Sequence, residues 1–215
     1  MPIHLYMAFV LTSAIVIATP GPTVLMVIAD ALAHHKRHAW STVLGVGLGD
    51  LVGMTISLAG AGAILRASAG AFVVMKVIGG LYLLYLGGRS IWSARMRRHD
   101  EAAELPVENV EKTPVSRFSS AFTVTVTNPK LLLFFVAFAP QFISTARSFI
   151  YQAAILIATF DIMAMINASG YAYMARSLGR KLTSPQMQRR VGYVSGGILI
   201  AAGIVVLALK YKQPA

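Results

Sequence analysis

Three charged side chains, those of Asp50, Asp161 and Lys130, lie inside long apolar segments of this sequence. A charge at the centre of a bilayer costs at least about 2.5–3.5 kcal/mol on insertion scales, and such residues ordinarily face a cavity or an oppositely charged partner. Two carboxylates and one ammonium can together bind both charges of a zwitterion, and a carboxylate can also carry a proton. The three residues therefore predict a buried polar site, unless each aspartate only forms hydrogen bonds that hold helices together.

The other charges in apolar segments lie nearer to segment ends. Lys130 is too deep for its ammonium to reach either surface, so it needs an anionic partner, which one of the aspartates or a substrate carboxylate could provide. Lys76 is nearer the end of its segment, and we expect its ammonium to extend to the outer surface. Asp30 could reach the opposite surface or pair with Lys36, and its role stays open.

Proline interrupts two of the apolar segments, in Thr19-Pro20-Gly21-Pro22 and in Thr127-Asn128-Pro129-Lys130. A proline removes a backbone hydrogen bond and frees a carbonyl group, which lipid cannot satisfy. The breaks should therefore face a cavity or packed protein, although simple proline kinks are also common in membrane helices. Pro22 can begin a new half-helix, whose positive N-terminal end suits a carboxylate.

The two breaks and the buried charges together make up the predicted substrate site. Interrupted helices that meet at equivalent depths are typical of transporter sites near the middle of the membrane. Asp50 and Asp161 are also the predicted proton-coupling residues, because they are the most deeply placed carboxylates. The predicted substrate-binding residues are Thr19, Pro20, Gly21, Pro22, Asp50, Asn128, Pro129, Lys130 and Asp161.

Metal, redox and enzyme chemistry have little support in the sequence. His34 and His38 have a spacing that can bind a transition metal, together with His35, but Lys36 and Arg37 lie between them and no carboxylate or cysteine follows. The chain has no cysteine, so it has no disulfide and no thiolate ligand. It also lacks the usual catalytic motifs. We predict no metal site, no cofactor and no enzymatic activity.

Long uncharged segments dominate the composition of the chain. Of its 215 residues, 56% are apolar and 13% are charged, against about 25% charged residues in soluble proteins. A helix that crosses a bilayer core needs about 20 mostly apolar residues. We therefore predict an all-α integral membrane protein with six transmembrane helices, near residues 5–33, 39–64, 68–92, 118–143, 148–175 and 191–210.

The loops between these segments predict the orientation in the membrane. Twelve Lys and Arg residues follow the first, third and fifth segments, and four lie on the opposite side. By the positive-inside rule, both termini face outward. Trp40 and Trp92 then lie at the cytoplasmic interface, and Tyr6 and Tyr211 at the outer one. This arrangement and contact with anionic lipid account for the net charge of +11, so no nucleic-acid partner is predicted.

The chain divides into two halves, 1–94 and 118–215, which are joined by a charged cytoplasmic linker, 95–117. The proline breaks and the aspartates recur in the same order in both halves. Because each half has three segments, the second half must enter the membrane from the opposite side, which makes an inverted repeat. A pair of glycines also recurs, as Gly80 and Gly87 in the first half and Gly196 and Gly203 in the second.

Small and polar residues accompany the predicted site. Gly45, Gly49 and Gly53 recur at a spacing of four, which lets another helix approach closely beside Asp50. Several other side chains could form hydrogen bonds with a substrate, although packing is their commoner role. They are Tyr82, Tyr85, Asn167, Ser169 and Tyr171.

Four motifs of this chain resemble those of the LysE/RhtB translocator family: Thr19-Pro20-Gly21-Pro22, Gly49-Asp50, residues 79–87 (GGLYLLYLG) and Asn128-Pro129-Lys130. Its members are bacterial inner-membrane exporters of amino acids. The resemblance covers nearly the whole chain and implies a proton-driven exporter of an amino acid. The Thr-Pro-Gly-Pro form looks more like the homoserine/threonine branch, which implies a neutral substrate. Redox carriers of the wider superfamily depend on a cysteine pair, which this chain lacks.

Two other functions compete with amino acid export. A divalent-metal efflux pump would use the two aspartates as ligands, but Lys130 would repel the cation. A membrane scaffold without transport activity would have no use for the central charges. The sequence leaves open which amino acid is exported and whether the protein forms a homodimer.

Overall fold

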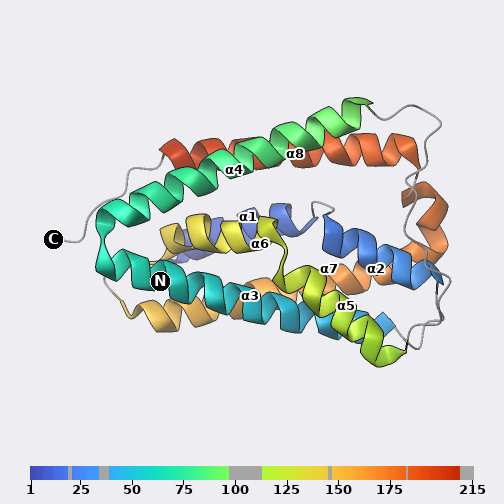
Figure 1. The fold of residues 1–215 in the computed structure, drawn as a ribbon, viewed down its shortest axis with the longest axis horizontal. Helices are drawn as coiled ribbons and strands as arrows, with labels where there is room; N and C mark the ends of the chain where they lie inside the picture. Colours follow the sequence, from blue (N-terminus) through green and yellow to red (C-terminus); the bar gives the residue numbers. More distant parts are fainter. Residues whose placement is uncertain (19–20, 34–38, 97–112, 145–146, 183, 209–215) are drawn as a thin grey trace.

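The computed structural model describes residues 1–18, 21–33, 39–96, 113–144, 147–182 and 184–208, and these residues are almost entirely helical (Figure 1). Two of the predicted segments are broken into shorter helices. The elements in chain order are α1 (Ile3–Ala18), α2 (Pro22–Ala33), α3 (Ala39–Ala67), α4 (Ala69–Met96), α5 (Pro114–Val126), α6 (Pro129–Leu133), the π-helix η2 (Phe134–Phe138), the 3-10 helix η3 (Ala139–Phe142), α7 (Phe149–Leu182) and α8 (Pro185–Ala208).

Among the described residues, three helices are long and apolar enough to cross a membrane, within α3, α7 and α8. Two bent pairs raise the number to five: α1 with α2, bent by 52°, and Pro114–Val126 with Pro129–Phe142, bent by 41°. The breaks therefore fall where the two proline motifs predict them. α4 is as long as these helices but contains three basic residues, and it lies along α8 (Figure 1).

Several helix ends differ from the predicted segment ends. α7 continues to Leu182 and α8 begins at Pro185, whereas the apolar segments predict 175 and 191. Hydropathy marks the lipid-covered length, but backbone hydrogen bonds continue a helix into water. Hydroxyl side chains mark three of the helix starts, since Ser68, Thr113 and Ser184 accept hydrogen bonds from backbone N–H groups in the first turns of α4, α5 and α8.

The helices form two layers with the short helices between them (Figure 1). α4 and α8 make up one layer, and α3, α5, α7 and α2 the other, while α1 and α6 lie in the middle. The turn at Ser68 lies at one end, which we call the turn end. α2 and α4 end at the opposite end, where α5 and α8 begin, and we call it the linker end.

Glycines bring the helices of each layer into backbone contact. A Cβ atom on Gly87 of α4 would lie 2.6 Å from the carbonyl oxygen of Gly196 in α8, and one on Gly203 would lie 2.9 Å from that of Gly80. The recurring glycines of the two halves therefore pack against each other. In the other layer, Gly45 and Gly49 of α3 have the same role toward α5. The predicted close approach beside Asp50 is confirmed.

Six phenylalanines fill the space between α1, η2, η3 and α7, from the turn end to the middle of the molecule. Hydrogen bonds in a π-helix span five residues rather than four, and in η2 the consecutive side chains of Phe134 and Phe135 are both fully buried. Their rings pack edge to face in several pairs, which closes this end against water. The six residues are Phe9, Phe134, Phe135, Phe138, Phe142 and Phe160.

Candidate substrate site at the two helix breaks

α1 ends in the protein interior, and its last three carbonyl groups accept hydrogen bonds from side chains of the second half. These bonds replace the backbone N–H partners that a continuous helix would provide. Side chains of α6 and α7 therefore satisfy the carbonyl groups at the end of α1. Lys130 Nζ donates to Val16 O at 2.7 Å, Asn167 Nδ2 to Ile17 O at 3.2 Å and Tyr171 OH to Ala18 O at 3.2 Å.

Asn128 joins the two breaks through its side-chain amide. Its Oδ1 accepts from the backbone N–H of Lys130 at 3.1 Å, which caps the start of α6. Its Nδ2 donates to Thr23 Oγ1 at 3.2 Å, in the first turn of α2. Because α2 begins at Pro22 and α6 at Pro129, the N-terminal ends of both half-helices meet here, as the sequence predicts for Pro22.

Asp50 of α3 and Asp161 of α7 come together from equivalent positions of the two halves. Asp50 is buried, and its carboxylate lies within electrostatic reach of Asp161 and Lys130. About one turn away the two helices touch, since a Cβ on Gly47 would lie 2.9 Å from Met165 Sδ. Each aspartate has one buried carboxylate oxygen without a hydrogen-bond partner among the described residues. The pair can therefore accept a proton or a cationic group.

Two cavities adjoin the breaks. A small one, of about 50 Å³, is lined by Gly21 and Thr23 of the first break, Asn128 and Lys130 of the second, and Asp50. A larger one, of about 510 Å³, extends from the breaks between α2, α4 and α8 toward the linker end. Gly21, Asn128 and Lys130 line both cavities, so these residues lie where the larger space meets the smaller one.

The structure brings together most of the predicted site residues. Gly21, Asp50, Asn128 and Lys130 line the small cavity, and Pro22 and Pro129 line the large one. Asp161 lines neither cavity but lies within electrostatic reach of Asp50. Thr19 and Pro20, and the histidines 34, 35 and 38, lie outside the described residues.

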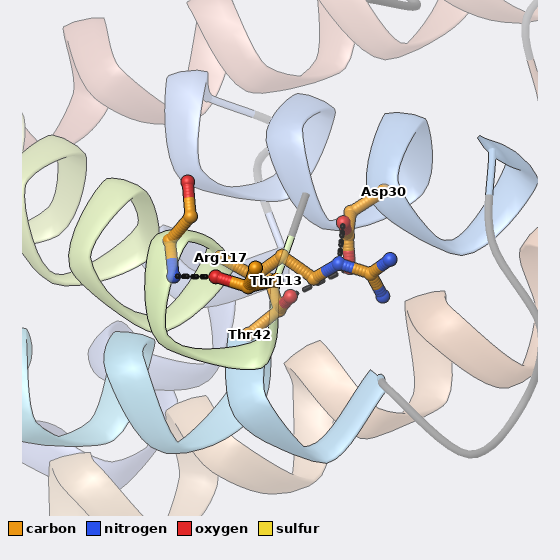
Figure 2. A network of polar contacts seen from close by, with 5 residues as sticks. Asp30, Thr42, Thr113 and Arg117 are labelled. Carbon is orange, nitrogen blue, oxygen red and sulfur yellow. Dashed lines mark hydrogen bonds and ion pairs between the residues drawn. The ribbon is translucent and has the colours of Figure 1, made fainter. Parts of the chain in front are cut away.

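Two charged residues outside the site, Asp30 and Lys76, have surroundings that the sequence did not predict. Asp30 of α2 pairs with Arg117 of α5, with 3.6 Å between Oδ1 and Nε, and accepts a hydrogen bond from Thr42 of α3 at 2.6 Å (Figure 2). This buried network joins three helices near the linker end.

Lys76 is only 6% exposed, so the expectation that it extends to the surface is wrong. Packing of α4 against other helices determines its burial, and depth in the segment does not predict that contact.

The sequence favours packing or helix-bridging roles for Asn167 and Tyr171, which their hydrogen bonds to α1 confirm, and it does not single out Arg89. A spacing of four places Asn167 and Tyr171 on one face of a helix, which was the available signal. Arg89 of α4 is exposed in the large cavity. Its signal was a basic residue inside an apolar segment, only about seven residues from the end of α4.

Within the described part of the chain, no group of three or more His, Cys, Asp or Glu side chains is placed to hold a metal ion. The two described aspartates near the breaks are accompanied by Lys130, which carries the charge opposite to theirs.

Broken helices that meet beside paired charges are typical of membrane transport proteins. The chain belongs to the LysE type translocator family, whose model matches residues 14–210. Three relatives show the range of similarity. A leucine efflux protein of Enterobacter sp. (strain 638) is 31% identical to this chain, over 82% of this chain and 83% of the relative. A homoserine/homoserine lactone efflux protein of Salmonella typhi is 26% identical, over 96% of this chain and 97% of the relative. An uncharacterized membrane protein of Vibrio cholerae is 28% identical, over 98% of this chain and 100% of the relative. No solved structure matches the chain significantly.

Proposed function

We propose that this protein exports a neutral amino acid from the bacterial cytoplasm in exchange for protons. The observation that carries the proposal is the position of Lys130, which lies between the end of α1, the start of α6 and Asp50, at the point where two cavities meet. The names of the relatives, leucine efflux and homoserine/homoserine lactone efflux, support the substrate class.

The proposed topology has six transmembrane helices in two inverted repeats, residues 1–94 and 118–215, with the linker 95–117 in the cytoplasm. The first transmembrane helix of the first half consists of α1 and α2, and that of the second half consists of α5, α6, η2 and η3. The third helices of the two halves are α4 and α8. Both termini then lie outside, as the positive-inside rule predicts. The linker end is the cytoplasmic end, so the large cavity is the cytoplasmic approach to the site.

The substrate carboxylate binds at Lys130 and the N-terminal end of α2. The ammonium of Lys130 and the positive end of this half-helix favour an anion at this point. The substrate ammonium lies toward Asp50, through the small cavity. The substrate side chain faces Leu25, Ile28 and Leu86 in the large cavity, which suits an apolar group.

Proton coupling follows because a proton and the substrate ammonium compete for the two aspartates. When Asp50 and Asp161 are both ionised, they repel each other, so either a proton or the substrate ammonium relieves the repulsion. When a proton enters from outside, it neutralises one of the two carboxylates, and the remaining negative charge is balanced by Lys130, so the substrate ammonium is released. When the proton leaves to the cytoplasm, the pair can bind the next substrate, so proton entry is coupled to substrate export.

Cells loaded with labelled dipeptide, which they hydrolyse to leucine, test the proposal. Cells that produce the protein should release labelled leucine faster than cells without it, and they should release it into medium of higher leucine concentration only in the absence of an uncoupler. An equal release from both kinds of cell would overturn the proposed export, and release against the gradient that persists with uncoupler would overturn the coupling.

A further inference from the structure

Among the described residues, the charged side chains that line the large cavity are all positive. Lys130 lies at its inner end and Arg89 on the wall formed by α4. None of the three described carboxylates, those of Asp30, Asp50 and Asp161, lines this cavity. A positively charged cavity with apolar walls concentrates anions, because low-dielectric surroundings focus the field of its charges.

Arg89 lies on a segment of α4 that is hydrogen-bonded to α8. Its neighbour Ser90 donates a hydrogen bond to the carbonyl oxygen of Gly192 at 3.0 Å and lies 3.1 Å from Ser195 Oγ, both in α8. Tyr82, two turns or about 10 Å before Arg89 along α4, lines the same cavity. The hydroxyls of Ser90 and Ser195 thus serve the packing of α4 on α8, whereas the guanidinium is exposed to the cavity.

The position of Arg89 also separates it from the basic residues that face lipid head groups. Arg95 lies in the last turn of α4, is exposed, and does not line the cavity. Arg89 lies six residues earlier, about 9 Å deeper along the helix. Among the described residues, no carboxylate pairs with its guanidinium, which lines the cavity.

We propose that Arg89 is a second carboxylate-binding residue, which captures the substrate on its way from the cytoplasm and passes it to Lys130. A planar guanidinium binds a carboxylate through two parallel hydrogen bonds. Capture at Arg89 and release to Lys130 move the solute along α4 while its ammonium remains in the cavity. The cavity therefore selects solutes with a free carboxylate and disfavours amines. This inference rests on the proposed function for its substrate, but the cavity charge can be tested without transport.

The absence of cysteine from the chain permits a direct test of the cavity charge. Ser93 lines the same cavity one turn from Arg89, so Ser93→Cys introduces a unique thiol beside the guanidinium. The rates at which this thiol reacts with an anionic and a cationic methanethiosulfonate are measured in the full-length protein. The ratio of the anionic to the cationic rate should fall about tenfold in Ser93→Cys/Arg89→Gln, because two unit charges about 6 Å apart interact appreciably even in water.

Two further variants separate the charge of Arg89 from other effects. Arg89→Lys should keep the ratio, since it keeps the charge, and Arg95→Gln should change it little, since Arg95 lies outside the cavity. An Arg89→Gln ratio equal to that of the parent would overturn the inference, as would an equal fall in Arg95→Gln.

Transport kinetics in proteoliposomes add the link to the substrate. Arg89→Gln should raise the KM for leucine about tenfold and leave kcat nearly unchanged, and Arg89→Lys should restore part of the KM. An unchanged KM in Arg89→Gln would overturn the role in capture. If the unmodified protein transports no amino acid, the proposed function fails, and the labelling ratio by itself then decides whether Arg89 charges the cavity.

Discussion

At the scale of single residues, Lys130 connects the two halves of the chain. Its ammonium donates to the carbonyl oxygen of Val16, at the negative C-terminal end of α1, and lies within electrostatic reach of Asp50. Its backbone N–H is held by Asn128. One residue thereby positions the end of one half-helix, the start of another and the charge that the proposed carboxylate requires.

Lys130→Met removes this charge with little change of side-chain volume. We expect export of amino acid to be lost, because an unpaired charge in a low-dielectric site costs about 3–5 kcal/mol, which corresponds to more than 100-fold in affinity. The measurement is leucine export together with the amount of folded protein in the membrane. Export at the rate of the unmodified protein would show that Lys130 is only a packing residue. Divalent-cation efflux that persists or improves in this variant would support the rival metal function.

Asp50→Asn and Asp161→Asn test the coupling. Each change removes a proton acceptor and leaves the shape of the site nearly intact, so concentrative export should be lost while insertion into the membrane is kept. Exchange of labelled for unlabelled substrate is expected to remain in at least one of the variants, because exchange needs no net proton movement. Wild-type export rates and pH dependence in both variants would refute proton coupling through these residues.

At the scale of elements, each broken helix is stabilised by the opposite half of the chain. α1 ends on side chains of α6 and α7, and α2 begins against Asn128 at the start of α6. Because a free carbonyl or N–H group in the bilayer is costly, neither break is stable without its partner. The layer of α4 and α8 lacks breaks and is held instead by close glycine contacts.

Gly87→Ala tests this close packing. The added Cβ would lie 2.6 Å from the carbonyl oxygen of Gly196, so α4 and α8 must move apart. We expect a loss of stability of about 1–3 kcal/mol, the usual cost of overpacking, measured as a lower Tm in detergent. Gly88→Ala is the matched control, since a Cβ there meets nothing within 4 Å. Equal Tm values for the two variants would contradict the packing.

The elements differ in how far they can be predicted from sequence. Pro22 and Pro129 mark both half-helix starts, because proline constrains the backbone locally. Asp50, Asp161 and Lys130 reveal their depth by their place in apolar segments. The acceptor of Lys130 was not predictable, since the expected partner was a carboxylate and the structure provides the carbonyl group of Val16. The surroundings of three other basic residues were not predictable either, because helices distant in sequence form them. These residues are Lys76, Arg89 and Arg117.

At the scale of the whole molecule, the two ends differ. Phenylalanines pack the turn end, whereas the large cavity reaches toward the linker end. In the proposed orientation this is a conformation that opens to the cytoplasm.

The orientation itself can be measured with reporter fusions. A reporter that is active only in the cytoplasm should be silent after Ala215 and active when inserted near Glu104, because the basic loops remain inside. The reverse pattern would contradict the orientation, and with it the assignment of the large cavity to the cytoplasmic side.

Transport by the purified protein in proteoliposomes tests the central proposal most directly. Vesicles with an acidic interior are placed in neutral buffer that contains labelled leucine, and uptake is compared with and without an uncoupler and with Lys130→Met. The account predicts accumulation above the external concentration, driven by proton efflux and lost in both controls. Two results with the unmodified protein would contradict the account: uptake of leucine only to equilibrium, or equal uptake in the absence of a proton gradient.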